Sequence, residues 1–308
     1  MNANSVARKV IKTVNSIVDF TVLVIILLLL VFAGYALWDS NQIHKAADSA
    51  QYAVYRPTVE NQGLSFMELK AINPDAFAWL TVYGTNIDYP VVQGRDNMQY
   101  VNTSAEGRYS LAGAIFMDYR NNKYFTDFNS IVFGHNMANR TMFGELGRFA
   151  GKDVFDSLKY GRLYVDGKEY GIEFFAFVHT DAYDNSVFMP DIRGEERQQA
   201  YLDNLFAVAM HKRDIGITIH DRIILLATCS SGSTNGRNLL VGRLTDEMPQ
   251  EAAAEDNVDR NGAEIVAHDS NDEISVTGPA RWQLVFILIP LILIVVLIAT
   301  LRSWTLKE

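Results

Sequence analysis

Two long apolar stretches constrain this chain more than any other feature of its sequence. One covers residues 17–38 and the other covers residues 282–301. Each is about as long as the roughly 20 residues that a helix needs to cross a bilayer. Both are predicted to be transmembrane helices, so the chain is expected to be a plasma-membrane protein that contacts the lipid bilayer at two places.

Charges beside the first stretch predict its orientation. Basic residues precede it and an acidic residue follows it, namely Arg8, Lys9, Lys12 and Asp39. Because positive charge favours the cytoplasmic side, residues 1–16 are expected to be cytoplasmic, the middle extracellular and residues 302–308 cytoplasmic again. A cleaved signal peptide is the alternative for the first stretch. Its apolar core is longer than the roughly 7–15 residues of such peptides, which favours a retained anchor.

The segment between the two spans divides by composition into a domain and a tether. Residues 246–281 are rich in acidic residues and poor in large apolar ones, which predicts a flexible acidic tether. Residues 39–245 are then expected to be one extracellular domain, because about 200 residues can bury a sufficient core.

Composition also excludes several classes of function. The net charge of −9 argues against a nucleic-acid partner, and the single cysteine excludes an internal disulfide. No Cys-x-x-Cys, no His-x-x-x-His and no acidic cluster at ligand spacing occurs, so no metal site is expected. The sequence contains neither a Walker loop nor a dinucleotide fingerprint, and no cofactor is expected.

Short apolar runs separated by turn residues dominate the extracellular domain. This pattern predicts a mainly β fold, and many short strands with few helices favour a closed or nearly closed barrel. Strands are expected at residues 77–83, 87–92, 114–117, 130–133, 162–165, 170–180, 218–219, 222–229 and 237–244. Helices are expected at residues 41–53, 65–72 and 195–211, the last from apolar residues at helical spacing.

Cys229 ends an apolar run and directly precedes a segment rich in serine, glycine and asparagine. A lone thiol at a strand end is a candidate nucleophile if a base and an electrostatic partner lie beside it, because the thiolate is the reactive species. The alternative is a small buried core residue, which free cysteine often is.

Arg237 is the candidate electrostatic partner of Cys229. The polar segment between them predicts a turn that joins antiparallel strands 222–229 and 237–244. If the two strands pair at the turn, the numbers of residues that lie opposite each other sum to about 466. Cys229 then faces Arg237, with Cβ atoms about 4.5–5.5 Å apart. Arg243 has the same parity but lies about 20 Å further along at about 3.3 Å per residue. Spacing therefore selects Arg237, and the alternative is a solvated charge at a strand start.

His135 is the candidate base among six histidines. Strand 130–133 runs into Gly134-His135-Asn136, where the chain turns and places the imidazole at a strand end, a suitable position for a general base. Strand-end histidines are common, so a structural role stays open. The other five are expected to be structural or to lie outside the folded core: His44, His179, His211, His220 and His268.

These segments together resemble the class B sortases, the cysteine transpeptidases of the Gram-positive cell surface. The motifs that carry the resemblance are Phe133-Gly134-His135-Asn136-Met137, Ala227-Thr228-Cys229 and Arg237 at the start of the next strand. Similar stretches lie upstream, at residues 73–100 and 113–121. The resemblance covers residues 45–245 in order and with family-like spacing.

The resemblance implies an eight-stranded sortase β-barrel with N-terminal helices and a helix in the loop before the cysteine strand. It implies that Cys229 is the nucleophile, His135 the acid/base and Arg237 the group that stabilises the substrate and the oxyanion. Thr228 would help to position the substrate through its backbone or hydroxyl. The alternative for Thr228 is a β-branched strand residue without a role in binding.

The resemblance also implies the substrates. One is a secreted protein with a C-terminal sorting motif similar to LPXTG or NPXTX, which is cleaved through a thioacyl intermediate. The other is an amine of the cell wall, supplied by a peptidoglycan precursor. A pilin lysine is the alternative amine, and it would make the enzyme a pilin-polymerising sortase. A non-catalytic surface-binding domain is the competing class, and it would not require the thiol.

Two features depart from the family pattern. Leu225 stands where the cysteine motif of the family usually begins with threonine, which is expected to be a packing change. The second predicted span is unusual for class B, whereas the pilus-assembling class C sortases carry a C-terminal anchor. The chain lacks the aromatic lid motif of class C, so cell-wall anchoring and pilin polymerisation both stay open.

Overall fold

The structure is a computed structural model that describes residues 3–57, 63–229 and 236–247. The second predicted span at 282–301 and the C-terminal residues 302–308 lie outside the described residues, as does the predicted tether beyond residue 247. Their assignments therefore stay predictions.

One helix in the described ranges is long and apolar enough to span a membrane. This helix, α1 (Ala3–Ala47), contains an apolar window of mean hydropathy 2.9, and no residue of the window is buried in the protein. Such a surface is unfavourable in water and suits a lipid environment. By its internal contacts, the chain divides between Ser40 and Asn41, and a compact domain begins at Asn41.

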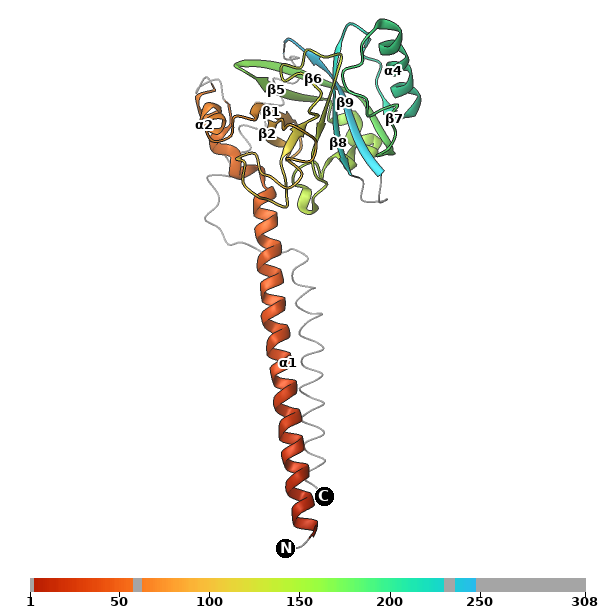
Figure 1. The fold of residues 1–308 in the computed structure, drawn as a ribbon. Helices are drawn as coiled ribbons and strands as arrows, with labels where there is room; N and C mark the ends of the chain where they lie inside the picture. Colours follow the sequence, from red (N-terminus) through yellow and green to blue (C-terminus); the bar gives the residue numbers. More distant parts are fainter. Residues whose placement is uncertain (1–2, 58–62, 230–235, 248–308) are drawn as a thin grey trace. The chain divides into compact units, whose positions relative to one another are not determined.

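Eight strands close into a barrel, as predicted, and Figure 1 labels most of them. The strands are β1 (Ala76–Val82), β2 (Asp88–Val92), β3 (Ile115–Met117), β4 (Asn129–Phe133), β5 (Tyr160–Val165), β6 (Lys168–Asp181), β8 (Arg222–Cys229) and β9 (Gly236–Thr245). Their order is β5-β1-β2-β3-β4-β8-β9-β6, and pairing of β5 with β6 closes the ring. Among these strands, β2–β3 and β4–β8 pair in parallel and the other neighbours are antiparallel.

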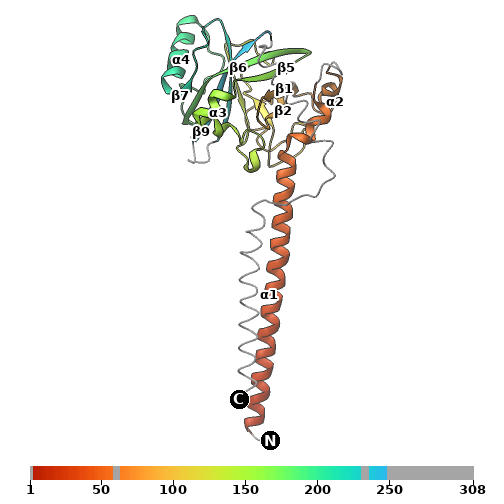
Figure 2. The same ribbon diagram turned by 180° about the vertical axis from the view of Figure 1, so that it is seen from behind.

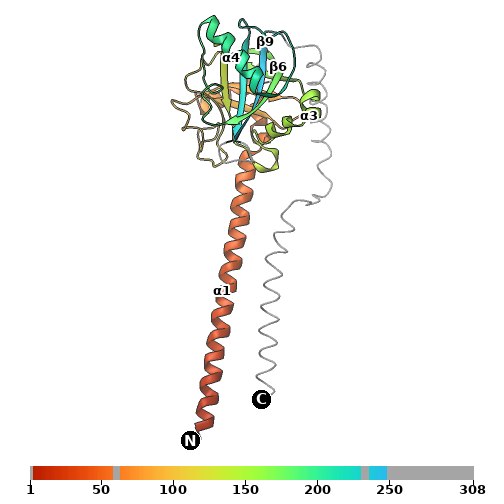
Figure 3. The same cartoon turned by 90° about the vertical axis from the view of Figure 1, so that its right-hand side faces the viewer.

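Short helices surround the barrel. They are η1 (Ser49–Tyr55), α2 (Leu64–Ile72), η2 (Ala138–Arg140), η3 (Leu146–Ala150), α3 (Lys152–Ser157) and α4 (Glu195–Val208). In Figures 1 and 2, α2 lies on one side of the barrel and α4 on the other. Figure 3 shows α4 alongside β6 and β9, and its position confirms the predicted helix before the cysteine strand.

Apolar residues on both faces of β8 are buried, which explains its continuous apolar sequence. Ile224 and Leu226 belong to a core cluster built mainly from barrel strands. Ile223 and Leu225 belong to a second cluster that also contains α4 residues. Successive side chains of a strand point to opposite faces, so β8 is sandwiched between these two cores. Leu225, which departs from the family motif, is fully buried in the second core.

Three predicted elements differ from the sequence-based expectation by more than one or two residues at an end. The helix predicted to reach residue 211 ends at Val208, because residues Ala209–Lys212 pair with β6 as a ninth strand, β7. The strand predicted at residues 218–219 is instead a turn, in which Asp221 accepts hydrogen bonds from the backbone and hydroxyl of Thr218. The polar helix predicted over residues 41–53 is the end of α1 followed by η1.

Candidate active site

The β8–β9 hairpin brings Cys229 opposite Arg237, as predicted. They form the last register pair of the hairpin, and the preceding pair is Thr228 with Asn238. The turn residues 230–235 lie outside the described residues. Arg237 also pairs with Thr180 of β6, so its backbone is held between two strands.

The guanidinium of Arg237 keeps most of its hydrogen-bonding capacity. It is partly buried and donates from Nη1 to the carbonyl oxygen of Gly236 at 3.1 Å. Within the described residues, Arg237 forms no ion pair with a carboxylate. Arg243, by contrast, faces Ile223 at the other end of the hairpin and forms an ion pair with Glu173. Arg237 is therefore the arginine of β9 that can serve a substrate.

His135 lies at the same end of the sheet as Cys229. β4 pairs in parallel with β8, with Phe133 opposite Ala227, and the Gly134 N–H donates to the Ala227 carbonyl at 3.1 Å. His135 follows Phe133 by two residues, and Cys229 follows Ala227 by two. Neighbouring strands are about 4.8 Å apart, so these two positions are adjacent at the carboxyl ends of parallel strands.

One ring nitrogen of His135 is fixed by the backbone. Nε2 lies 2.8 Å from the carbonyl oxygen of Val101, and because a carbonyl oxygen only accepts, Nε2 carries the hydrogen. In the neutral ring, Nδ1 is then the nitrogen without a hydrogen. Sequence reasoning did not identify Val101, since a backbone carbonyl leaves no trace in the residue type.

Gly113 lies against both the His135 ring and the carbonyl oxygen of Val101. Its φ is +63°, and a Cβ built there would lie 2.5 Å from the Val101 oxygen and 3.1 Å from Cδ2 of His135. No larger residue fits without displacing one of these groups. In the sequence, the only sign of this tight packing is a glycine between two turn-rich segments.

Thr228 immediately precedes Cys229 in β8 and pairs with Asn238 of β9. Its side chain is buried on the face of β8 that belongs to the barrel core, because alternate residues of a strand point to opposite faces. Its Oγ1 has no hydrogen-bond partner among the described residues. Asn238, opposite Thr228, is bonded through Oδ1 to Nδ1 of His179 at 2.8 Å, which gives His179 a structural partner.

The buried carboxylate of Asp118 is hydrogen-bonded to Asn97, four residues before Val101. Asp118 is fully buried, receives two hydrogen bonds from the Arg120 guanidinium and accepts one from Nδ2 of Asn97 at 2.9 Å. Burial by itself raises the pKa of Asp118, but the hydrogen bonds from Arg120 and Asn97 outweigh it and lower the pKa below its ordinary value. Asp118 is therefore charged at neutral pH.

The described ranges contain no group of three or more His, Cys, Asp or Glu residues that could hold a metal ion. The backbone places His135, Cys229 and Arg237 at the same end of the neighbouring strands β4, β8 and β9. A nucleophile beside an acid/base and a preorganised donor is the arrangement that acyl transfer requires.

Several known proteins are similar to this chain in sequence and in fold. No model of a protein family matches the chain. Sortase B of Staphylococcus aureus is 30% identical over 183 residues, which cover 58% of this chain and 74% of that protein. The structure of sortase B from the type II pilus of Streptococcus pneumoniae is 48% identical, with a TM-score of 0.52, and the match covers 58% of this chain and 98% of that one.

A class B sortase of Streptococcus pyogenes involved in pilus biogenesis is 39% identical, with a TM-score of 0.55, over 59% of this chain and 99% of that one. The chain belongs to the class B sortases, and it is a cysteine transpeptidase of that family.

Proposed function

We propose that this protein is a membrane-anchored sortase that cleaves a C-terminal sorting motif of secreted proteins and transfers the acyl group to an amine of the cell wall. The observation that carries the proposal is the register pair of Cys229 and Arg237 beside the parallel strand end that holds His135. The expected motif is similar to LPXTG or NPXTX.

Acylation begins at the carbonyl carbon of the scissile peptide bond. The thiolate of Cys229 attacks this carbon, the C–S bond forms and the C–N bond breaks. His135 donates a proton to the leaving amine, and Arg237 donates hydrogen bonds to the oxygen as its negative charge develops. Donors preorganised in this way typically lower the barrier by about 3–4 kcal/mol.

Deacylation reverses these roles. An amine attacks the thioacyl carbon, His135 accepts its proton and the thiolate of Cys229 leaves as the new amide forms. Thr228 contributes to binding through its backbone in this proposal, because its hydroxyl is buried on the opposite face of β8.

Mass spectrometry of the full chain in detergent tests the chemistry. Incubation with a sorting-motif peptide should add the mass of the acyl fragment to the protein, and an added amine should release it as an amide. Cys229→Ala should abolish both events, and His135→Ala should reduce turnover by at least about a hundredfold. His220→Ala is the matched control, because His220 is exposed in the turn before β8, at the opposite end of the β4–β8 pair from His135. Transfer by Cys229→Ala would refute the proposal.

Pilin polymerisation is the second candidate function. Among solved structures, the two pilus-related class B sortases are 48% and 39% identical to this chain, sortase B of Clostridium perfringens is 38% identical and sortase B of S. aureus is 26% identical. In that case the amine is a lysine of a pilin subunit. Competition between a lysine-bearing peptide and an oligoglycine for the thioacyl enzyme distinguishes the two acceptors.

The proposed location is the plasma membrane, with the catalytic domain outside the cell and both termini in the cytoplasm. The support is the apolar α1 and the basic residues that precede its apolar core. Because the chain has one cysteine, single cysteines placed in a Cys229→Ala background report topology cleanly. Membrane-impermeant labelling of a cysteine at residue 4 in intact cells would contradict this orientation.

A further inference from the structure

A buried tyrosine joins the end of α1 to the loop that follows His135. Tyr89 of β2 is 1% exposed, and its hydroxyl donates to the carbonyl oxygen of Ala47, the last residue of α1, at 2.8 Å. The same hydroxyl accepts from the backbone N–H of Met142 at 2.9 Å. One side-chain oxygen therefore connects two backbone segments that are distant in sequence.

Met142 lies in a short loop that is closed on His135. The Phe143 N–H donates to the His135 carbonyl at 3.0 Å, and Asn136 forms a β-bridge with Met142. A displacement of Met142 is therefore passed directly to the backbone of His135.

The backbone of this loop is strained and needs external support. Asn139, Arg140 and Met142 have φ values of 61°, 60° and 52°, in the left-handed region that non-glycine residues rarely adopt. Such conformations cost free energy and persist only when surrounding contacts hold them. The Tyr89 hydroxyl is one of these contacts, because it binds the N–H of the last strained residue.

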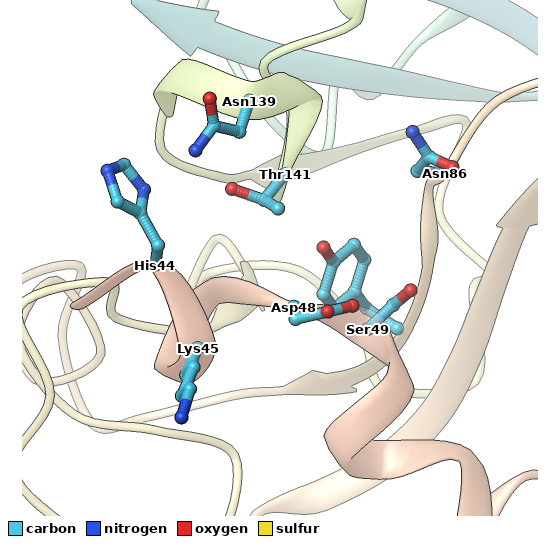
Figure 4. Close-up of a pocket in the computed structure, with 8 residues that line it drawn as sticks. His44, Lys45, Asp48, Ser49, Asn86, Asn139 and Thr141 are labelled. Atoms are coloured by element: carbon cyan, nitrogen blue, oxygen red, sulfur yellow. The ribbon is translucent and has the colours of Figure 1, made fainter. Parts of the chain in front are cut away.

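A pocket lies beside the loop 135–143, on the side that faces the end of α1. This pocket of about 360 Å³ separates η2 from the end of α1, and Figure 4 shows Asn139 and Thr141 across it from His44 and Lys45. Side chains do not fill this space between η2 and the end of α1. The Tyr89 hydroxyl is one direct link between the end of α1 and this loop, through its hydrogen bonds to Ala47 and Met142.

We propose that Tyr89 is a positioning residue for His135, and that it fixes the loop 135–143 against the last turn of α1. The proposal rests on the acid/base role proposed for His135. Through Tyr89, the helix that carries the predicted membrane anchor contributes to the geometry of the catalytic histidine. The effect should appear in the chemical step more than in binding of the sorting motif, because Tyr89 contacts the histidine loop and not the β8–β9 hairpin.

Tyr89→Phe tests the proposal, because it keeps the ring and removes only the hydroxyl. We expect the amide of Met142 to exchange at least about tenfold faster and kcat to fall about tenfold, since small misplacements of catalytic groups are costly. The KM for the sorting peptide should stay within about twofold. The NMR titration midpoint of His135 and the pH dependence of kcat should shift together.

Tyr201→Phe is the matched control. Tyr201 is also buried, and its hydroxyl donates to the Val187 carbonyl at 2.7 Å under α4, away from the His135 loop. If Tyr89→Phe and Tyr201→Phe have the same Met142 exchange, His135 titration and kcat, the proposal is wrong. Faster Met142 exchange without any change in kcat and His135 titration would also overturn it, because Tyr89 would then be merely structural.

A second variant acts from the α1 side. Ala46→Gly weakens the last helical turn and leaves the Tyr89 hydroxyl in place, and it should change Met142 exchange in the same direction. Combined with Tyr89→Phe it should add little, because both act through one hydrogen-bonded link. Failure of the wild-type chain to transfer any acyl group would refute the proposed function, whereas Met142 exchange and the His135 titration would still decide the role of Tyr89.

Discussion

Cys229 and Arg237 form the final register pair of the β8–β9 hairpin, and Arg237 is paired on its other side with Thr180. Its backbone therefore cannot move without breaking two strand pairings. Its side chain, in contrast, is bonded only to the neighbouring Gly236 carbonyl in the described structure. A fixed backbone with uncommitted donors is the preorganised arrangement that the role proposed for Arg237 requires.

Replacing Arg237 should therefore impair chemistry more than folding. We expect Arg237→Ala to lower kcat by about a hundredfold to a thousandfold, the usual cost of removing one oxyanion donor. Arg237→Lys should recover only part of this loss, because an ammonium group cannot reproduce the planar fork of donors. Steady-state transpeptidation with a fluorescent sorting peptide measures both effects.

Arg197→Ala provides the control for the Arg237 variants. Arg197 is exposed on α4, outside the β8–β9 hairpin, so its removal should leave kcat within about twofold. Equal losses of activity in the two alanine variants would show that the effect arises from net charge and not from the position of Arg237.

The hairpin could be predicted from the sequence because residues that are close together along the chain specify it. An apolar run, a polar turn and a second apolar run specify both strands and their register, so the pairing of Cys229 with Arg237 could be calculated from residue numbers. The position of His135 beside Cys229 depends on the parallel pairing of β4 with β8, which are about 90 residues apart. Local patterns do not encode that pairing, and family resemblance supplied it.

Other features were missed for the same reason. The end of α4 and the strand β7 depend on pairing of Ala209–Lys212 with β6, and this tertiary contact overrides helical periodicity. The supports of His135 are a backbone carbonyl at Val101 and a missing Cβ at Gly113. The Val101 carbonyl has no residue-type signature, and Gly113 is visible only as a glycine between turn-rich segments, so the sequence alone does not assign either to His135.

Gly113→Ala should displace His135 and its backbone partner. The new Cβ would lie 2.5 Å from the Val101 oxygen at a φ of +63°, so the change combines left-handed strain with overpacking. Together these should cost about 2–4 kcal/mol of stability and lower kcat at least about tenfold. Denaturant unfolding and turnover measure the two effects.

Gly167→Ala separates strain from steric clash. Gly167 has a φ of +86° but no heavy atom within 4 Å of its would-be Cβ. We expect a loss of only about 1–2 kcal/mol and an unchanged kcat. If Gly113→Ala behaves like Gly167→Ala, contact with His135 is unimportant.

Thr228→Val should be tolerated. The buried Oγ1 of Thr228 has no hydrogen-bond partner in the described part of the chain, so its removal leaves no donor or acceptor unsatisfied. We expect unchanged or slightly higher stability and turnover within about threefold of the wild type. A loss of more than about tenfold in kcat/KM would show instead that the hydroxyl contacts the substrate.

Asp118→Asn should destabilise the domain at neutral pH. The carboxylate is fully buried and bonded to both Arg120 and Asn97, and an amide can replace only one of its oxygens. Because the Arg120 side chain is about half exposed, the ion pair is partly screened, and we expect a loss of about 2 kcal/mol. Asp156→Asn is the control, since Asp156 pairs with Lys152 on the surface and should change stability little.

Acidification should then remove the difference between the wild type and Asp118→Asn. The pKa of Asp118 is raised by burial but lowered more strongly by its hydrogen bonds from Arg120 and Asn97, so it lies below the value of an unfolded chain. The stabilisation is therefore complete above about pH 4, where an unfolded aspartate is ionised, and is lost as the pH falls through the lower folded-state pKa. Unfolding free energies measured from pH 6 to pH 3 should converge, because asparagine does not titrate. Parallel curves over this range would mean that Asp118 contributes through packing and not through its charge.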